Sequence, residues 1–245
     1  RSEEVEMLEY ALVLLVGFIV GTINGMAGGA SLLSFPVLLA IGLNPVSATV
    51  TNSLGVSSAN IFAWISNKQT GWAVFHKYKK IIFLATCFSA LGAVALLALP
   101  SEVFQNVVPF LLLFATFSLL LPRKPRIGKL HKNLERSALA ASGFYCGYFG
   151  PGQGVIVIAT LSQDSSRTPQ EVNSAKNVIV GITSALSNFL YLFSGQVIWP
   201  IFAALFVGSS LGGLMGGYWA SRIPTQIFRA LVFFVGLIAS CWLFV

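Results

Sequence analysis

The sequence contains two long stretches without a single charged side chain. No Asp, Glu, Lys or Arg occurs from Ala11 to Asn67, and none occurs from Asn177 to Ser221. About a quarter of the residues of an average soluble domain are charged, whereas only 9% of these 245 residues are. Apolar runs of about 20 residues are what a helix needs to cross the hydrocarbon core of a bilayer. The chain is therefore expected to be an all-α, polytopic integral membrane protein.

Six apolar segments are long enough to cross a membrane. They lie at about 46–66, 81–99, 103–121, 172–193, 197–220 and 226–245. Two further regions consist of shorter apolar segments on either side of a glycine-rich sequence: Leu8–Ile23 with Ala30–Ile41, and Ser137–Phe149 with Val155–Leu161. At about 1.5 Å per residue, the shorter member of each pair reaches only about 20 Å. Both pairs are predicted to be broken helices or re-entrant hairpins rather than ordinary spans.

The order of these segments is the same in both halves of the chain, a broken glycine-rich segment followed by three full spans. Because such self-similarity indicates an internal duplication, residues 1–121 and 137–245 are predicted to be two transmembrane repeats joined by a basic cytoplasmic linker, 122–136. The glycines that match at one constant offset are Gly21, Gly25 and Gly28 in the first half and Gly143, Gly147 and Gly150 in the second.

Basic residues are concentrated in three short segments, Lys68–Lys80, Arg123–Arg136 and Arg222–Arg229. Loops rich in Lys and Arg stay on the cytoplasmic side, so the net charge of +7 indicates orientation in the cell membrane rather than binding to nucleic acid. The span 46–66 would then run inward and 172–193 outward, which makes the halves antiparallel and places the C-terminus outside. The N-terminus is expected outside too if each broken segment returns to its own side. Inverted repeats with interrupted helices are a recurrent architecture of secondary transporters.

The two glycine-rich breaks are candidate binding elements, because irregular backbone inside a membrane is tolerated only where protein or a water-filled cavity surrounds it. A helix that starts after Gly29 and another that starts near Gly154 would both direct their N–H groups and positive dipole ends at the breaks. Two such ends that meet at mid-membrane form an anion site. The alternative is close helix packing through small residues, which is the interpretation given to Gly17, Gly21 and the glycines between 208 and 217.

Lys176 is the single charged residue of the span 172–193, and it shares a polar helix face with Asn173, Asn177, Ser184 and Asn188. An ionisable residue inside a membrane is a candidate functional residue by default. The alternative is that its side chain extends to the headgroups at the cytoplasmic end of the helix. The matching face of the span 46–66 is neutral but able to donate hydrogen bonds. It carries Thr49, Thr51, Asn52, Ser57 and Asn60.

Several kinds of chemistry are excluded by what the spans lack. No span interior contains Asp or Glu, which argues against a carboxylate relay for cations or protons. His76 and His131 lie in the basic segments, so a hydrolase nucleophile would have no base within reach. The three cysteines, at 87, 146 and 241, are far apart and lack metal-ligand spacing. No enzyme activity, metal or cofactor is expected.

The sequence from Gly21 to Ala40, GTINGMAGGASLLSFPVLLA, followed by Pro45 and Thr51-Asn52, resembles the first signature of the TauE/SafE sulfite exporter family, also called the toluene-sulfonate uptake permease family. The second half, from Gly143 to Asn177, is similar to its second signature, with Pro151 and Gln153 interrupting the usual glycine run. The resemblance implies an integral transporter of small sulfur-containing or carboxylate anions, such as sulfite or organosulfonates.

The chain is therefore expected to be a secondary transporter, an exporter, that moves a small anion by alternating access around a site at mid-membrane. Lys176 is the expected charge partner of the substrate. An anion channel and a membrane scaffold that uses its glycines only for packing remain as alternatives, and the oligomeric state is left open. The predicted substrate-binding residues are Asn24, Gly25, Gly28, Gly29, Ser31, Thr51, Asn52, Gly152, Gln153, Gly154, Lys176 and Asn177.

Overall fold

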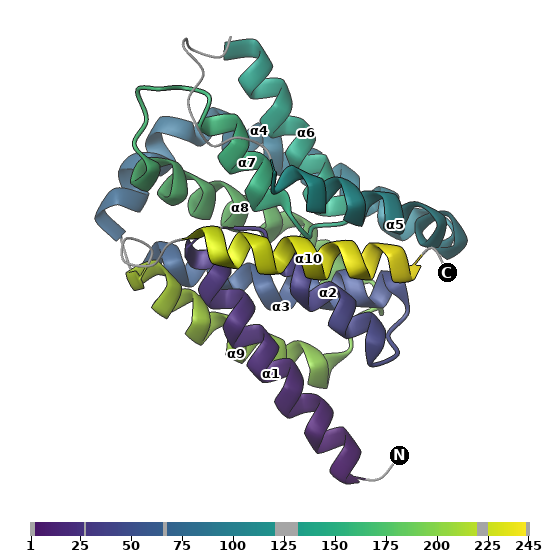
Figure 1. Cartoon of the computed structure of the whole chain (residues 1–245). Coiled ribbons are helices and arrows are strands. Elements are labelled where there is room, and N and C mark those ends of the chain that lie inside the picture. The colour runs from purple at the N-terminus through teal and green to yellow at the C-terminus, as the bar shows by residue number, and fades with distance from the viewer. Residues whose placement is uncertain (1–2, 27, 66–67, 121–131, 220–224, 244–245) are drawn as a thin grey trace.

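The computed structural model describes residues 3–26, 28–65, 68–120, 132–219 and 225–243. Within these ranges the chain forms ten helices and no strand (Figure 1), which confirms the all-α prediction. The helices are α1 (Glu3–Met26), α2 (Ser31–Ala40), α3 (Pro45–Ile65), α4 (Lys68–Ala98), α5 (Ser101–Ser118), α6 (Lys132–Tyr148), α7 (Gln153–Leu161), α8 (Pro169–Leu192), α9 (Trp199–Trp219) and α10 (Thr225–Leu243).

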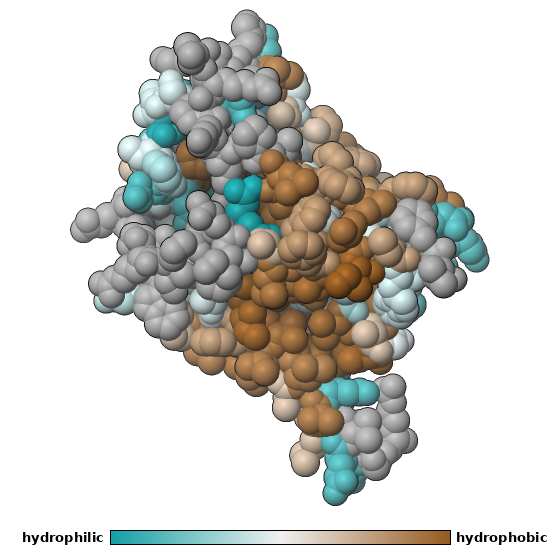
Figure 2. Space-filling view, viewed as in Figure 1, coloured by the Kyte–Doolittle hydropathy of each residue, from teal (hydrophilic) through white to brown (hydrophobic). Residues whose placement is uncertain are grey.

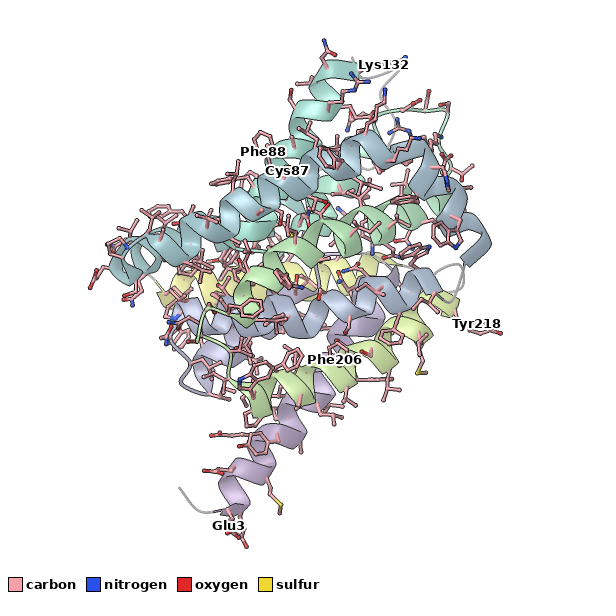
Figure 3. All side chains as sticks on the ribbon, turned by 180° about the vertical axis from the view of Figure 1, so that it is seen from behind. Glu3, Cys87, Phe88, Lys132, Phe206 and Tyr218 are labelled. Carbon is pink, nitrogen blue, oxygen red and sulfur yellow. The ribbon has the colours of Figure 1, made fainter. Side chains whose placement is uncertain are left out.

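Four helices in the described part of the chain are long and apolar enough to cross a membrane, within α1, α4, α5 and α9. Large apolar side chains such as Phe88 on α4 and Phe206 on α9 point outward (Figure 3), and apolar residues cover most of the middle of the face shown in Figure 2. A surface of this kind suits contact with lipid rather than water. The chain is a multi-pass membrane protein.

The helices α3 and α8 are also long enough to span, with 21 and 24 residues, but they are not among those four. Both carry buried polar side chains, including Asn52 and Asn60 on α3 and Lys176 on α8. Because these polar groups face protein rather than lipid, α3 and α8 form the polar interior of the molecule.

The prediction that both members of each glycine-flanked pair are short is wrong for the first pair. Helix α1 has 24 residues, or about 36 Å at about 1.5 Å per residue, and most of it is apolar enough to cross a membrane. Glu3, Glu4 and Glu6 lie in its first turn, where acidic side chains stabilise the positive end of the helix dipole. The short members are α2, with 10 residues, and α7, with 9.

Three predicted helix starts also need correction. Lys68–Lys80, expected to be a loop that includes His76, forms the first turns of α4, and α6 starts at Lys132 inside the predicted linker. Helix α8 starts at Pro169 because the side chain of Thr168 accepts a hydrogen bond from the N–H of Glu171, the first half of a capping box. The remainder of the linker, His131 included, lies outside the described residues.

Helices α1, α3 and α9 form one group of long helices, and α4, α6 and α8 form a second group that runs in the opposite direction. Ser47, Ser53 and Asn60, in order along α3, bond to Gln196, Asn188 and Lys176, in reverse order along α8 and the residues that follow it. Helices α3 and α8 are therefore antiparallel, as predicted for these two segments. Glu3 of α1 and Lys132 of α6 lie at opposite ends of the molecule (Figure 3). The assignment of whole halves to repeats stays a prediction.

Glycines set the distance between the helices within each group. A Cβ atom added at Gly21 of α1 would lie 2.3 Å from the carbonyl oxygen of Ser209 on α9, and one at Gly147 of α6 would lie 1.8 Å from that of Ser89 on α4. Real side chains do not approach so closely. The packing interpretation is confirmed for Gly17 and Gly21, and also for Gly208, Gly212, Gly213 and Gly216, whose added Cβ atoms would meet the backbone of α1 or α3.

Candidate functional site

Each glycine-rich break reverses the chain between a long helix and a short one. Gly28 and Gly29, between α1 and α2, have φ angles of 71° and 85°. Gly150 and Gly152, between α6 and α7, have φ angles of 91° and 90°. Residues with a side chain rarely adopt these left-handed conformations. The glycines of the breaks therefore have a conformational role that those of the helix contacts lack.

The two breaks meet each other inside the molecule. The N–H of Gly152 donates to Oγ of Ser31 over 3.3 Å, and a Cβ atom at Gly28 would lie 3.3 Å from the carbonyl carbon of Gly154. Neither Ala30 nor Gly152, the N-cap residues of α2 and α7, makes a side-chain capping bond. The first N–H groups of a helix have no partner four residues earlier within the helix; here several of them bond to carbonyl oxygens at the breaks, such as Leu32 to Gly29 and Gln153 to Gly150. The positive dipole ends of both short helices are thus directed at one place.

A cavity of about 40 Å³ lies at this meeting point. A water molecule needs about 10–15 Å³ of such space, so the cavity has room for roughly three waters or one small anion. None of the described residues that line it is acidic or basic. Its walls are formed by Asn24, Ser31, Asn52, Ser53, Val56, Ser57, Asn60, Cys146, Gly150, Pro151, Gln153, Gly154, Val180 and Ser184.

Gln153, the first residue of α7, has the most unusual environment in the cavity wall. Its side chain is 2% exposed, and among the described residues neither Oε1 nor Nε2 has a hydrogen-bond partner. A buried polar group without a partner costs about 1–3 kcal/mol. Gln153 is therefore placed to bond to whatever occupies the cavity.

The amide and hydroxyl groups of α3 are held in place by neighbouring helices. Oδ1 of Asn52 accepts a hydrogen bond from Ser34 of α2 over 2.6 Å, which leaves the amide nitrogen of Asn52 as its donor on the cavity wall. Across the seam with α8, Asn188 accepts from Ser53 and donates to Ser57, both over 2.8 Å. The polar lining is consequently fixed by bonds made behind it.

Lys176 is fully buried, so its ammonium group does not extend to the headgroups. Its Nζ donates to the backbone oxygen of Asn24, to Oδ1 of the adjacent Asn177 and, over 3.4 Å, to Oδ1 of Asn60. Lys176 does not border the cavity, although Asn24 and Asn60 do. The ammonium thus lies behind the wall, at the carboxyl end of α1.

Of the twelve predicted binding residues, the structure places five on the cavity wall: Asn24, Ser31, Asn52, Gln153 and Gly154. Gly25, Gly28, Gly29, Gly152, Lys176 and Asn177 surround this wall without bordering the cavity, and Thr51 accepts a bond from the N–H of Ile198 before α9. Further lining residues were not among the twelve. Asn60, Ser57 and Ser184 lie on the polar faces noted in the sequence, whereas Cys146 is surrounded by apolar sequence that provides no signal.

A second polar cluster lies at the end of the molecule where α4, α6 and α8 begin. Nη2 of Arg167 donates to both carboxylate oxygens of Glu135 over 3.0 Å, and its Nε lies 3.5 Å from Asp164. The guanidinium also stands over the ring of Tyr78 at 5.6 Å. This group, here called the Arg167 cluster, joins α4, α6 and the α7–α8 connection. In the described part of the chain no group of His, Cys, Asp and Glu could hold a metal ion.

The comparison with protein families agrees with this architecture. The family described as "Sulfite exporter TauE/SafE" matches residues 13–243. The chain belongs to the TauE/SafE family. No solved structure matches this TauE/SafE chain.

The relatives of this TauE/SafE chain are described as probable membrane transporters. A "Probable membrane transporter protein" of Haemophilus influenzae is 30% identical over 235 residues, which covers 91% of this chain and 89% of the relative. The protein YfcA of Escherichia coli K12, with the same description, is 25% identical over 96% of this chain and 90% of its own length. YunE of Bacillus subtilis is 21% identical over 96% of this chain and 97% of its own. These comparisons assign the chain to the membrane transporters.

Proposed function

We propose that this transporter moves small oxyanions, such as sulfite, across the cell membrane and that the central cavity is its substrate site. The observation that carries the proposal is Gln153, a buried amide without a partner among the described residues. It lies where the N-termini of α2 and α7 meet, neither of which has a side-chain cap from its N-cap residue. Helix N-termini bind oxyanions through backbone N–H groups and the helix dipole. The side-chain amides and hydroxyls of the wall add further donors.

The charges around the cavity favour an anion over a cation. The described part of the cavity wall contains no carboxylate, and the positive ends of α2 and α7 are directed at the cavity. The negative ends of the α1 and α6 dipoles, which also meet at the breaks, would oppose an anion. Donors from α8 pair with carbonyl oxygens at both ends: Lys176 with Asn24 of α1, and Tyr191 with Gly147 of α6.

The size of the cavity favours a substrate of few atoms. Space of about 40 Å³ corresponds to about three waters, which suits the four non-hydrogen atoms of sulfite. An aromatic sulfonate would need a wider cavity in another conformation. An inside-negative potential contributes about 2.3 kcal/mol per charge per 100 mV, so an oxyanion gains free energy on export without a coupled cation.

Alternating access is supported by a second hollow along the same two helices. This outer hollow, of about 490 Å³, is bordered by Val46 at the start of α3 and by Ser194 and Gln196 after α8. The central cavity is bordered by Ser53 and Ser184, seven residues after Val46 and ten residues before Ser194. Among the described lining residues, none borders both spaces. A conformational change that opens the α3–α8 seam would connect the central site with the outer hollow.

The proposal is tested by sulfite efflux from proteoliposomes that contain the purified protein. Efflux above that of protein-free liposomes is expected, and Gln153→Leu is expected to reduce it at least about tenfold, because one donor to a charged ligand contributes about 1.5–3 kcal/mol. Gln163→Leu, at a glutamine that bonds to Ala159 outside the cavity, is the matched control. Efflux equal to protein-free liposomes for sulfite would overturn the proposal. A carrier is expected to accumulate labelled sulfite inside proteoliposomes loaded with unlabelled sulfite, by exchange of one for the other, whereas a channel is not.

A further inference from the structure

We infer that Lys176 is a positioning residue, whose buried ammonium orients the Asn60 amide of the cavity wall so that it presents its N–H donors to the substrate. The inference rests on the proposed function and assigns the preference for anions to a side chain that does not touch the substrate. It replaces a direct ion pair between Lys176 and the anion.

The first step is the placement of the ammonium group. Lys176 is fully buried, and Nζ donates to three oxygen atoms, those of Asn24, Asn60 and Asn177. Its methylene chain lies behind the start of α7, since a Cβ atom at Gly154 would be 3.3 Å from Cδ of Lys176. The ammonium is thereby held one layer behind the cavity.

The second step follows from the chemistry of an ammonium group, which has three donors and no acceptor. An amide beside it must turn its oxygen toward the ammonium. Asn60 does so with Oδ1, and because Asn60 also borders the cavity, its NH₂ group is the end that remains for the substrate. Without the ammonium the two ends of the Asn60 amide are nearly equivalent in size, and the oxygen could face the cavity instead.

The third step concerns the backbone. Asn24 lies in the last turn of α1, where helix carbonyl groups have no partner within the helix. These carbonyls form the negative end of the α1 dipole, close to the positive ends of α2 and α7. The bond from Lys176 to the oxygen of Asn24 counters part of this negative end, and the amides of Asn173 and Asn177 counter another part at the oxygen of Gly25. The orientation of the Asn60 amide is therefore the contribution that depends on Lys176 alone.

The test compares the binding of sulfite and urea to the purified transporter, by isothermal titration calorimetry. Both ligands have four non-hydrogen atoms, but urea is neutral and presents N–H donors of its own. Lys176→Met is expected to weaken sulfite binding at least about tenfold, the effect of losing one hydrogen bond to a charged ligand. The same variant is expected to raise the affinity for urea relative to that for sulfite. Lys80→Met, at an exposed lysine of α4, is the control and should leave both affinities unchanged.

A double-mutant cycle separates positioning from direct binding. If Lys176 acts through Asn60, then Asn60→Leu and the double variant Lys176→Met/Asn60→Leu weaken sulfite binding by similar factors, because the second change removes nothing further. Fully additive losses would indicate direct contact between Lys176 and the anion and would overturn the inference. Lys176→Gln, which retains hydrogen bonding without charge, serves if Lys176→Met does not fold.

Two further outcomes are distinguishable. If the role of Lys176 is purely structural, Lys176→Met will lower the melting temperature of the ligand-free protein and leave the ratio of sulfite to urea affinity unchanged. This result would refute the positioning role but not the proposed function. If the unaltered protein binds no sulfite and shows no sulfite efflux, the proposed function fails first, and the inference with it.

Discussion

At the scale of single residues, Gln153 and Lys176 show opposite solutions for a polar group in the interior of a membrane protein. Lys176 satisfies its donors with protein oxygens and stabilises the arrangement around it. Gln153 is equally buried, yet both of its amide atoms lack a partner in the described structure. A buried polar side chain that contributes nothing to stability is expected where a ligand supplies the missing bonds.

This contrast predicts that Gln153→Leu stabilises the ligand-free transporter while it weakens substrate binding. Removal of an unsatisfied buried amide should raise the free energy of unfolding by about 1 kcal/mol, measured as a higher melting temperature in detergent without substrate. Gln163→Leu, which loses the bond to Ala159, should show no such gain. A lower melting temperature for Gln153→Leu than for the unaltered protein would mean that Gln153 has a structural role.

At the scale of helices, two ion pairs join α4, α6 and the start of α8 and differ in their exposure. The side chains of Glu135 and Arg167 are 11% and 10% exposed, whereas those of Lys77 and Glu171 are 54% and 28% exposed. Removing one partner of a buried pair leaves an uncompensated charge, but solvent screens an exposed pair. The Arg167 cluster should therefore contribute to the docking of α6 on α4 far more than the Lys77–Glu171 pair.

The expected result is that Glu135→Gln lowers the free energy of unfolding by about 2–4 kcal/mol, slightly below the range for fully buried pairs. Lys77→Met should cost less than about 1 kcal/mol, as surface ion pairs do. Thermal unfolding in detergent measures both, and high salt should change only the Lys77 pair. Equal losses for the two variants would show that the Arg167 cluster is not an effective buried pair.

Helix boundaries show where reading of the sequence succeeds and where it does not. The all-α class and the glycine breaks could be predicted because apolar length and backbone freedom are local properties. The start of α8 could have been found in Thr168-Pro169-Gln170-Glu171, which has capping-box spacing. The cavity is different. Asn52 and Gln153 could be predicted from polar faces and breaks, but the position of Lys176 depends on where the end of α1 meets α8, and Cys146 has no polar neighbours in sequence.

At the scale of the whole molecule, the shared direction of α4 and α6 brings basic residues to one end. Helices α4 and α6 run side by side in the same direction, since Gly143 and Gly147 of α6 meet Ala85 and Ser89 of α4 in the same order. Their basic first turns, with Lys77 and Lys132, therefore share one end, and the turn that contains Ser101 lies at the other end of α4. The positive-inside rule predicts that this basic end lies in the cytoplasm.

A prediction for intact cells follows from this arrangement. In a background with Cys87, Cys146 and Cys241 replaced by Ala, a membrane-impermeant maleimide should label Ser101→Cys in intact cells. It should label Lys132→Cys only after the membrane is permeabilised, because both side chains are exposed but lie at opposite ends of the helix bundle. Labelling of both positions before permeabilisation would contradict a single orientation. Labelling of Lys132→Cys alone in intact cells would show that the basic end faces outward. Because Ser101 borders the outer hollow, the predicted pattern would show that this hollow opens to the extracellular side, where an exported oxyanion is released.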